Sequence, residues 1–407
     1  MNSEMSSLTI HEKRGAAALA EMRDEWQELF RATTAAPFLS WEWATAWQQT
    51  FGRSLEPRLL CARDQNGALI GLLSLGAETC SVAGLPLRKL SLLGAGDGAA
   101  DYVEVLARPG REQQCARALL EHLAADRSFD LLELDGLATD SLCLPMLTES
   151  FGNHGDFRLQ LQPRYLCPQM TIHGTADELL SSGRLKRLVR KLEKMPGFEH
   201  RLVTAPAEAD EAFARFIRLH EARWAASGEA GAISAQTMKQ FQREVVRRMA
   251  QAGWLRIEEL WIEGDCRATL YGFETGRRYY LYLSGYQPEW AKLSPGFVII
   301  GLAISRALER GVREIDFLRG AEAYKAAWAN AARSTLAVRV TARTAAARLS
   351  VARDHLAVAA RALLPDAATL WLSRLRRRFS AKGAAVKTPE KKRAKETVAA
   401  LPLTNEG

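Results

Sequence analysis

The stretch from Arg278 to Trp328 constrains the fold more than any other part of the 407-residue chain. It begins with an aromatic strand pattern at 279–283 and continues, after a loop, with an almost wholly apolar helix pattern at 297–309. A second strand pattern follows at 312–318, and a short helix pattern at 324–328. An apolar helix between two strands must be buried against the sheet that they form. The stretch therefore predicts a strand–helix–strand unit with polar residues at the strand ends.

The loop before the apolar helix reads Ser294-Pro295-Gly296. Ser294 is suited to cap the helix, Pro295 to occupy its first position, and Gly296 to let a ligand approach the backbone. The free N–H groups of a first helical turn attract anions. The loop is therefore a candidate pyrophosphate site, although the same three residues also serve simply to start a helix.

The same order of elements occurs in both halves of the chain. A predicted strand pair turns near Gly67 in the first half and near Gly264 in the second. Each pair is followed by a strand, a loop ending in Pro-Gly, a helix, and another strand. We infer an internal duplication. It predicts lobes at 1–165 and 166–340. The change of composition after them predicts a helical extension at 341–380 and a disordered basic tail at 381–407.

The net charge of +8 is concentrated between Arg374 and Lys395, at the end of the helical extension and the start of the tail, where ten lysines and arginines stand against one acidic residue, Glu390. The body is nearly neutral, which argues against a nucleic-acid footprint over the whole protein. The tail is compatible with contact with an anionic membrane surface, and equally with a solubilising role. The cysteines and histidines form no metal-binding pattern. With no signal peptide or membrane-spanning run, we expect a cytoplasmic protein, with peripheral contact at the inner membrane face as the alternative.

Two helix patterns carry further candidate residues. One, at 179–195, combines an apolar stripe with a row of arginines and lysines, and fits either an anionic ligand or a solvated surface. The other, at 207–226, places His220 and Trp224 on one face beside Arg223. His220 is suited to act as a base near pH 7, or to be a buried structural histidine.

The segment Asp316-Phe317-Leu318-Arg319-Gly320, followed by Tyr324, Lys325 and Trp328, resembles the signature of the CelD/BcsL-like, or BioF2-like, family of the GNAT acyltransferase superfamily, related to the FemABX peptidyltransferases. Leu219-His220 with Arg223-Trp224, and Tyr282-Leu283-Ser284-Gly285-Tyr286 with Ser294-Pro295-Gly296, resemble two further elements of that family. The resemblance covers about 37–340. It implies an α/β fold, a mixed sheet of tandem GNAT-like lobes, and acyl transfer from acyl-CoA.

The expected site residues follow from this resemblance and from the chemistry of acyl transfer. The expected catalytic residues are Asp316, Tyr324, Lys325 and His220; the cofactor-binding residues are Ser284, Tyr286, Ser294, Pro295, Gly296 and Arg319; and the substrate-binding residues are Arg223, Trp224 and Trp328. Asp316 is the first candidate for the base, because strand alternation directs it away from Ile315 and Phe317, so that it need not be buried in their core face. No metal is expected.

The sequence thus predicts an N-acyltransferase that uses acyl-CoA, with acetyl-CoA as the first expectation. The expected acceptor is a small-molecule or saccharide amine, such as a sugar or an envelope or exopolysaccharide precursor. One alternative is a FemABX-like transferase that uses aminoacyl-tRNA, which the neutral body disfavours and the basic helix favours. Another is a non-catalytic assembly factor for polysaccharide biosynthesis.

Overall fold

The computed structural model describes residues 8–96, 100–152, 155–181, 183–320 and 322–363. The chain divides into one compact unit that ends at Ser350 and a second that begins at Val351. Of the second unit, only the last residues of one helix are described. The part of the expected helical extension beyond residue 363, and the expected basic tail, therefore lie outside the described residues.

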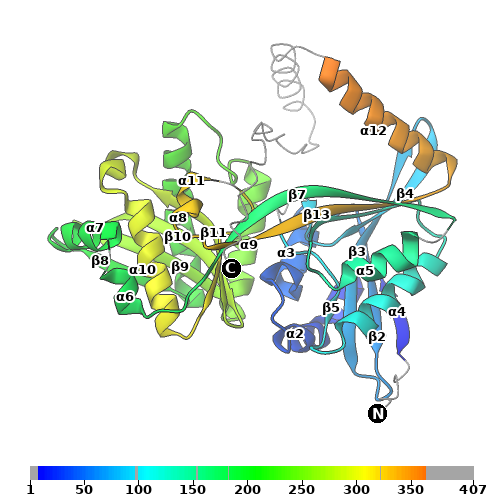
Figure 1. Cartoon of the computed structure of the whole chain (residues 1–407), viewed down its shortest axis with the longest axis horizontal. Coiled ribbons are helices and arrows are strands. Elements are labelled where there is room, and N and C mark those ends of the chain that lie inside the picture. Colours follow the sequence, from blue (N-terminus) through cyan, green and yellow to red (C-terminus); the bar gives the residue numbers. More distant parts are fainter. Residues whose placement is uncertain (1–7, 97–99, 153–154, 182, 321, 364–407) are drawn as a thin grey trace, which may run out of the picture. The chain divides into compact units, whose positions relative to one another are not determined.

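Figure 1 shows the order of the helices and strands. The first half contains β1 (Thr9–Arg14), α1 (Ala16–Glu21), α2 (Arg23–Arg31), η1 (Pro37–Leu39), α3 (Trp41–Thr50), β2 (Glu56–Arg63), β3 (Leu69–Val82), β4 (Leu85–Leu92), β5 (Leu106–Ala107), α4 (Glu112–Ala125), β6 (Leu131–Ala138), α5 (Cys143–Leu147), η3 (Thr148–Gly152) and β7 (Phe157–Thr171). The second half contains α6 (Ala176–Leu180), α7 (Gly183–Glu193), β8 (Glu199–Val203), α8 (Pro206–Ala226), α9 (Gln236–Gln251), β9 (Leu255–Ile262), β10 (Asp265–Thr275), β11 (Arg278–Tyr286), η4 (Pro288–Leu293), α10 (Pro295–Glu309), β12 (Glu314–Asp316), α11 (Ala323–Ala326), β13 (Ala331–Ala342) and α12 (Ala345–Leu363).

A single mixed sheet of thirteen strands runs through both halves (Figure 1). Its order is β1-β2-β3-β4-β6-β13-β7-β12-β11-β10-β9-β8, and β5 pairs with β3. The two long strands β7 and β13 pair with each other and carry the sheet from one half to the other. β13, the last strand of the second half, lies between β6 and β7 of the first. The expected lobe boundary at 165–166 falls within β7.

The internal duplication predicted from the sequence is confirmed. In the first half the hairpin β2–β3 is followed by β4, and α4 connects β4 to the parallel strand β6. In the second half the hairpin β9–β10 is followed by β11, and α10 connects β11 to the parallel strand β12. Each half therefore repeats a hairpin, a strand, a crossover helix and a parallel strand.

Helix α10 forms where the sequence predicts it. Its own side chains are apolar on all sides, and a glycine follows its last turn. Its side chains from Val298 to Leu308 are nearly all buried. Gly311 takes a φ of 88°, and the following Val312 N–H donates to the carbonyl of Ala307 at 3.0 Å. Such a left-handed glycine closes a helix without the strain that a side chain would add.

Two predicted elements differ from the structure. The helix expected at 179–195 is divided into α6 and α7. The strand expected at 312–318 is limited to the three residues of β12. Leu318 has a φ of 56°, which is incompatible with an extended strand.

The two faces of the second half's sheet are covered by different helices. Tyr271 and Phe273 of β10 share a core with α8 and α9, whereas the alternate residue Leu270 shares a second core with α7 and α10. The first of these cores also reaches the first half, since Trp43 contacts Phe241 with ring centroids 5.1 Å apart. Residues of β11 and β12 are therefore buried on both faces.

Candidate active site

The strands β11 and β12 part after a short parallel pairing. Arg278 pairs with Glu314, and Tyr280 with Asp316, where β12 ends. β11 continues to Tyr286, and on this side no described strand pairs with it beyond Tyr280. This side of β11 is therefore a strand edge to which an extended ligand can add.

β11 also contains a β-bulge at the point where the strands part. Tyr282 is the extra residue, because Leu281 pairs with Gly272 and Leu283 already pairs with Tyr271. Gly272 permits this geometry, since a Cβ there would be too close to the carbonyl oxygen of Tyr280. Bulges redirect backbone groups out of the regular ladder and are over-represented beside active sites.

The start of α10 lies next to the end of β11. The helix begins at Pro295, as predicted, but Ser294 does not cap it: Ser294 is left-handed, with φ 51° and ψ 49°, and its side chain makes no capping bond. That conformation is not the extended one in which a cap side chain reaches the first helical N–H groups. A Cβ on Gly296 would lie 3.3 Å from the ring of Tyr286. The N–H of Gly296 therefore has no cap and lies close to an aromatic ring.

Two arginines reach this corner from other helices. Arg184 of α7 donates to the Ser294 hydroxyl at 3.0 Å and lies over the ring of Phe297 at 4.7 Å. Arg223 of α8 lies over the ring of Tyr286 at 5.4 Å and donates to the Ser284 hydroxyl at 3.3 Å. Neither arginine has an ion pair among the described residues.

We name these five residues the β11–α10 cluster: Arg184, Arg223, Ser284, Tyr286 and Gly296. It brings together three expected cofactor-binding residues and one expected substrate-binding residue. Arg184 lies in the basic stretch that the sequence singled out, but no local pattern distinguished it from its neighbours.

His220 supports the same corner from inside α8. The ring is 1% exposed, and Nδ1 lies 3.0 Å from the carbonyl oxygen of Ser284. Burial lowers the pKa of His220, so the ring is neutral near pH 7 and donates from Nδ1. Nε2 is buried without a hydrogen-bond partner and faces Gly231, where a Cβ would lie 2.8 Å away.

Asp316 lies away from the core of Ile315 and Phe317, as expected, but it is buried on the other face of the strand. Its carboxylate accepts from Gln169 Nε2 at 2.7 Å and from the N–H of Leu318 at 2.8 Å, and burial raises its pKa. β12 lies inside the sheet, with both faces covered, so strand alternation does not lead to solvent there. The carboxylate holds the turn that follows β12.

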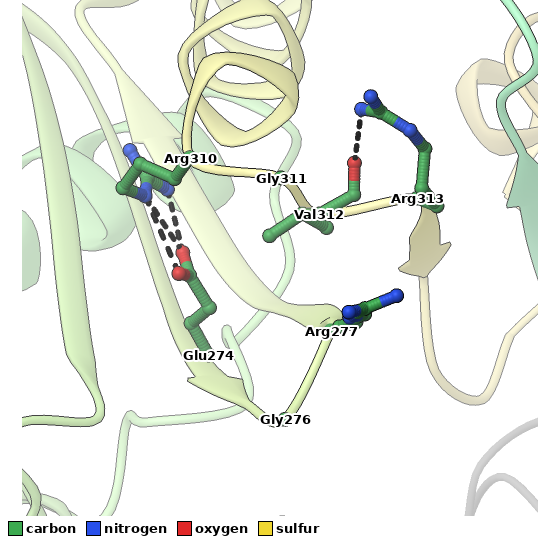
Figure 2. Close-up of a pocket in the computed structure, with 7 residues that line it drawn as sticks. All are labelled: Glu274, Gly276, Arg277, Arg310, Gly311, Val312 and Arg313. Atoms are coloured by element: carbon green, nitrogen blue, oxygen red, sulfur yellow. Dashed lines mark hydrogen bonds and ion pairs between the residues drawn. The ribbon is translucent and has the colours of Figure 1, made fainter.

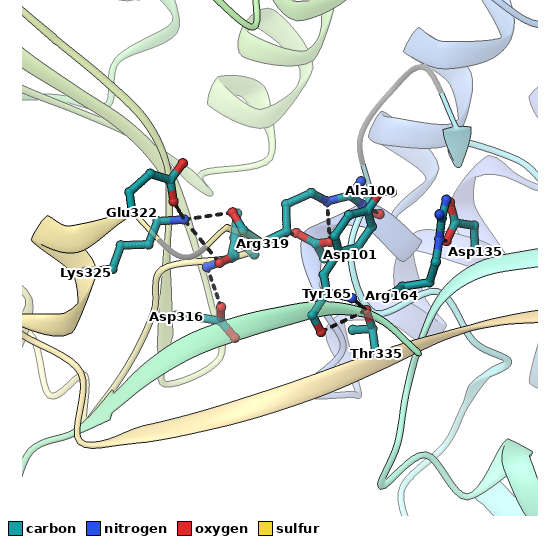
Figure 3. Close-up of polar contacts among 11 residues, drawn as sticks. Ala100, Asp101, Asp135, Arg164, Tyr165, Asp316, Arg319, Glu322, Lys325 and Thr335 are labelled. Atoms are coloured by element: carbon teal, nitrogen blue, oxygen red, sulfur yellow. Dashed lines mark hydrogen bonds and ion pairs between the residues drawn. The ribbon is translucent and has the colours of Figure 1, made fainter. Parts of the chain in front are cut away.

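The side chains of Arg319 and Lys325 also make their polar contacts with other residues of the protein (Figure 3). Arg319 Nε lies 2.6 Å from Asp101 Oδ1, and its guanidinium lies over the ring of Tyr165 at 4.4 Å. The buried ammonium of Lys325 lies 2.8 Å from the carbonyl oxygen of Arg319 and 2.9 Å from Glu322 Oε2, with the Leu318 carbonyl oxygen at 3.3 Å. Neither cation joins the β11–α10 cluster.

The remaining expected residues lie beside α10 and at the end of α8. Trp328 stacks on Phe297, with ring centroids 4.6 Å apart, and is largely buried. Trp224 follows Arg223, and the Arg223 guanidinium lies 5.3 Å from the centre of the Trp224 ring. The pKa of the half-buried Tyr324 is raised, first by burial and then by Glu322, while Arg223 opposes the rise. The Tyr324 hydroxyl therefore stays protonated and lies within electrostatic reach of the cluster.

Two cavities lie elsewhere in the second half. One, of about 390 Å³, is at the far end of α10 and is lined by Glu274, Gly276, Arg277, Arg310, Gly311, Val312 and Arg313 (Figure 2). The other, of about 650 Å³, is lined by Arg218, Leu219, Ala222, Ala226, Arg267, Gln287, Pro288, Glu289 and Trp290. No expected site residue lines either cavity. Over the described ranges, no group of three or more potential metal ligands occurs.

Comparison with known proteins finds a family match within the second half. Residues 181–326 match the family described as acetyltransferase (GNAT) domain. No curated protein matches the chain. The crystal structure of FemX is similar with a TM-score of 0.56 at 12% identity, over 79% of this chain and 96% of FemX. A tandem GNAT protein from the clavulanic acid biosynthesis pathway is similar with a TM-score of 0.43 at 13% identity, over 81% of this chain and 98% of that protein.

The similarity to FemX shows the fold alone, because so few of the residues are identical. The match to an acetyltransferase family supports acyltransferase activity, and it argues against a non-catalytic assembly factor. None of the described helices is long and apolar enough to cross a membrane. Residues 181–326 are therefore similar to a GNAT acetyltransferase domain, the fold is that of tandem GNAT proteins, and the chain is an acyltransferase.

Proposed function

We propose that this protein is an acyl-CoA-dependent N-acyltransferase, with acetyl-CoA as donor and an amine of a sugar or envelope-polysaccharide precursor as acceptor. One observation carries the proposal: the free edge of β11, left where β12 ends, leads directly to the uncapped start of α10. Together these features offer backbone groups to an amide-containing arm and a cationic corner to a pyrophosphate.

The β11–α10 cluster suits the phosphates of CoA. The Gly296 N–H lies at the positive end of α10, and Arg184 and Arg223 approach from two sides without ion-pair partners. An arginine guanidinium binds phosphate oxygens in a fixed, forked geometry. The pantetheine amides would pair with the edge of β11 between 283 and 286, as an added strand does.

The chain's own residues then have separate tasks. Acyl-CoA supplies an acyl group that is already activated as a thioester. Backbone N–H groups at the Tyr282 bulge stabilise negative charge on the thioester oxygen. The acceptor amine attacks the thioester carbon, a C–N bond forms and the C–S bond breaks. The protonated Tyr324 hydroxyl donates a proton to the departing sulfur and regains one from the nitrogen of the new amide. His220 holds the Ser284 carbonyl, and Asp316 and Lys325 hold the turn that leads into α11.

Calorimetric titration of the full-length protein with acetyl-CoA tests the proposal. We expect micromolar binding that a Gly296→Glu variant abolishes, because the new carboxylate would meet the Tyr286 ring and repel phosphate. Gly155→Glu is the matched control, since a Cβ there meets no described residue within 4 Å. Absence of binding to acetyl-CoA and to longer acyl-CoAs would overturn the proposal and leave aminoacyl-tRNA as the donor to test.

A further inference from the structure

Helix α7 presents a row of positive charges to solvent. Arg184, Arg187, Lys191 and Lys194 follow the spacing i, i+3, i+7 and i+10, which places them in one line along the helix and just past its end. All four are exposed, whereas Leu185, Val189 and Leu192 on the other face are buried in the core beneath α10. We name these four residues the α7 stripe.

No acidic residue of the described chain forms an ion pair with any member of the α7 stripe. By contrast, Arg215 of α8 and Arg247 of α9, on the next two helices along the chain, both pair with carboxylates. Like charges three and four positions apart destabilise a helix. Positive charge near the helix start also opposes the macrodipole. The stripe thus costs helix stability, and an anionic ligand would offset that cost.

The stripe begins at the β11–α10 cluster and follows the same edge of the sheet. Arg184 touches Ser294 at the start of α10. Beyond the other end of α7, the carbonyl of Pro196 accepts from the N–H of Glu263 in the β9–β10 turn. That turn lies at the edge where β11 ends, because Ala268 pairs with Tyr286. A ligand anchored at Arg184 can therefore extend along the stripe without leaving this edge.

We propose that Arg187 and Lys191 bind the ribose 3′-phosphate of the acyl-CoA donor, so that the enzyme selects CoA over dephospho-CoA. This inference rests on the proposed function. In CoA the 3′-phosphate lies one ribose away from the pyrophosphate, which the cluster holds. Along the helix axis Arg187 lies about 4.5 Å from Arg184, and Lys191 about 10 Å, at a rise of 1.5 Å per residue. Long side chains bridge such intervals.

Lys194 provides the internal control. It has the same charge and is similarly exposed, but it lies about 15 Å along the axis from Arg184, beyond the reach of a single ribose phosphate. A longer polyanion such as tRNA would contact the whole stripe and would involve Lys194 as much as Arg187. A loss of affinity on changing Arg187 but not Lys194 therefore indicates a nucleotide-sized ligand, and equal losses at both indicate a nucleic acid.

The test is calorimetric titration of the wild-type protein and of the Arg187→Gln, Lys191→Gln and Lys194→Gln variants with CoA and with dephospho-CoA. We expect wild-type protein to bind CoA about tenfold more tightly than dephospho-CoA. Arg187→Gln and Lys191→Gln should each weaken CoA binding about fivefold and leave dephospho-CoA binding unchanged. Lys194→Gln should change neither.

Equal affinity of the wild-type protein for CoA and dephospho-CoA would overturn the inference while leaving the proposed function intact. Equal losses in all three variants, with both ligands, would also overturn it, since they would indicate general attraction rather than a phosphate site. Failure of both ligands to bind would overturn the proposed function as well. Thermal unfolding of each variant shows whether it is folded.

Discussion

The carboxylate of Asp101 and the guanidinium of Arg319 join the two halves of the protein, with Oδ1 and Nε 2.6 Å apart. Asp101 is 1% exposed, and its second oxygen accepts from the backbone N–H of Arg319 at 3.1 Å. The carbonyl of Arg319 in turn accepts from the Lys325 ammonium. A residue of the first half therefore fixes the turn that leads to α11 and Tyr324 in the second (Figure 3).

Asp101→Asn should lower the free energy of unfolding by about 3 kcal/mol, because it leaves the Arg319 cation largely buried without a counter-charge. Urea denaturation at pH 7 measures the effect. Asp140→Asn is the control: Asp140 pairs with Arg333 at 2.7 Å but is mostly exposed, so its loss should cost less than about 1 kcal/mol. Equal effects of the two changes would contradict a structural role for the buried pair.

Tyr324→Phe should reduce kcat about a hundredfold with little change in KM, because it removes the proton donor without removing the ring. The raised pKa of Tyr324 keeps the hydroxyl protonated beyond the ordinary tyrosine value of about 10. The wild-type activity should therefore show no alkaline loss that depends on Tyr324 below that pH. Initial rates with acetyl-CoA across the pH range measure both effects. A variant with unchanged kcat would rule out this role.

His220→Asn should flatten the acid dependence of stability. The pKa of His220 is lower in the folded protein than in the unfolded chain, so the unfolded chain binds the proton more readily. Stability is complete above the unfolded pKa of about 6.5 and declines as the pH falls below it, by at most about 1.4 kcal/mol per pH unit from this residue. Asparagine keeps a donor for the Ser284 carbonyl but does not titrate.

Urea denaturation between pH 7 and pH 5 tests the role of His220. His11→Asn is the matched control, because His11 is exposed. The decline should persist in that variant and be reduced in His220→Asn. The same decline in both variants would show that another group is responsible.

Gly285→Ala should separate α8 from β11. A Cβ at Gly285 would lie too close to the backbone N of His220 and 2.7 Å from the carbonyl carbon of Leu219. We expect unfolding free energy to fall by about 3 kcal/mol, as for severe overpacking, and acetyl-CoA binding to weaken because Arg223 moves with α8. Gly155→Ala, where the added Cβ meets nothing within 4 Å, should change neither property. Denaturation and calorimetry measure the two effects separately.

Local patterns predicted the elements that build the site. The apolar run of α10, the aromatic strand β11 and the repeated order of elements were all visible in the sequence, because each depends on neighbours a few residues apart. Ser284, Tyr286 and Gly296, which the sequence places together in one expected site, lie on the two elements that meet at the corner.

Long-range contacts could not be predicted in the same way. Asp101 carries no local signal, and its partner Arg319 lies 218 positions away. The burial of Asp316 depends on Gln169, which belongs to β7. Ser294 was expected to cap α10, but its side chain is bonded to Arg184 of α7 instead. Each error arose where a tertiary contact decides the environment of a residue whose local pattern has several uses.

The position of β13 has a consequence for synthesis on the ribosome. β13 lies between β6 and β7, so two strands of the first half have no neighbour on their facing edges until residue 342 has been translated. Unpaired edges of this kind are templates for pairing with other chains. Nearly the whole chain must therefore emerge before the amino-terminal half can close its sheet, and a chain released early would expose two open strand edges to any nascent neighbour.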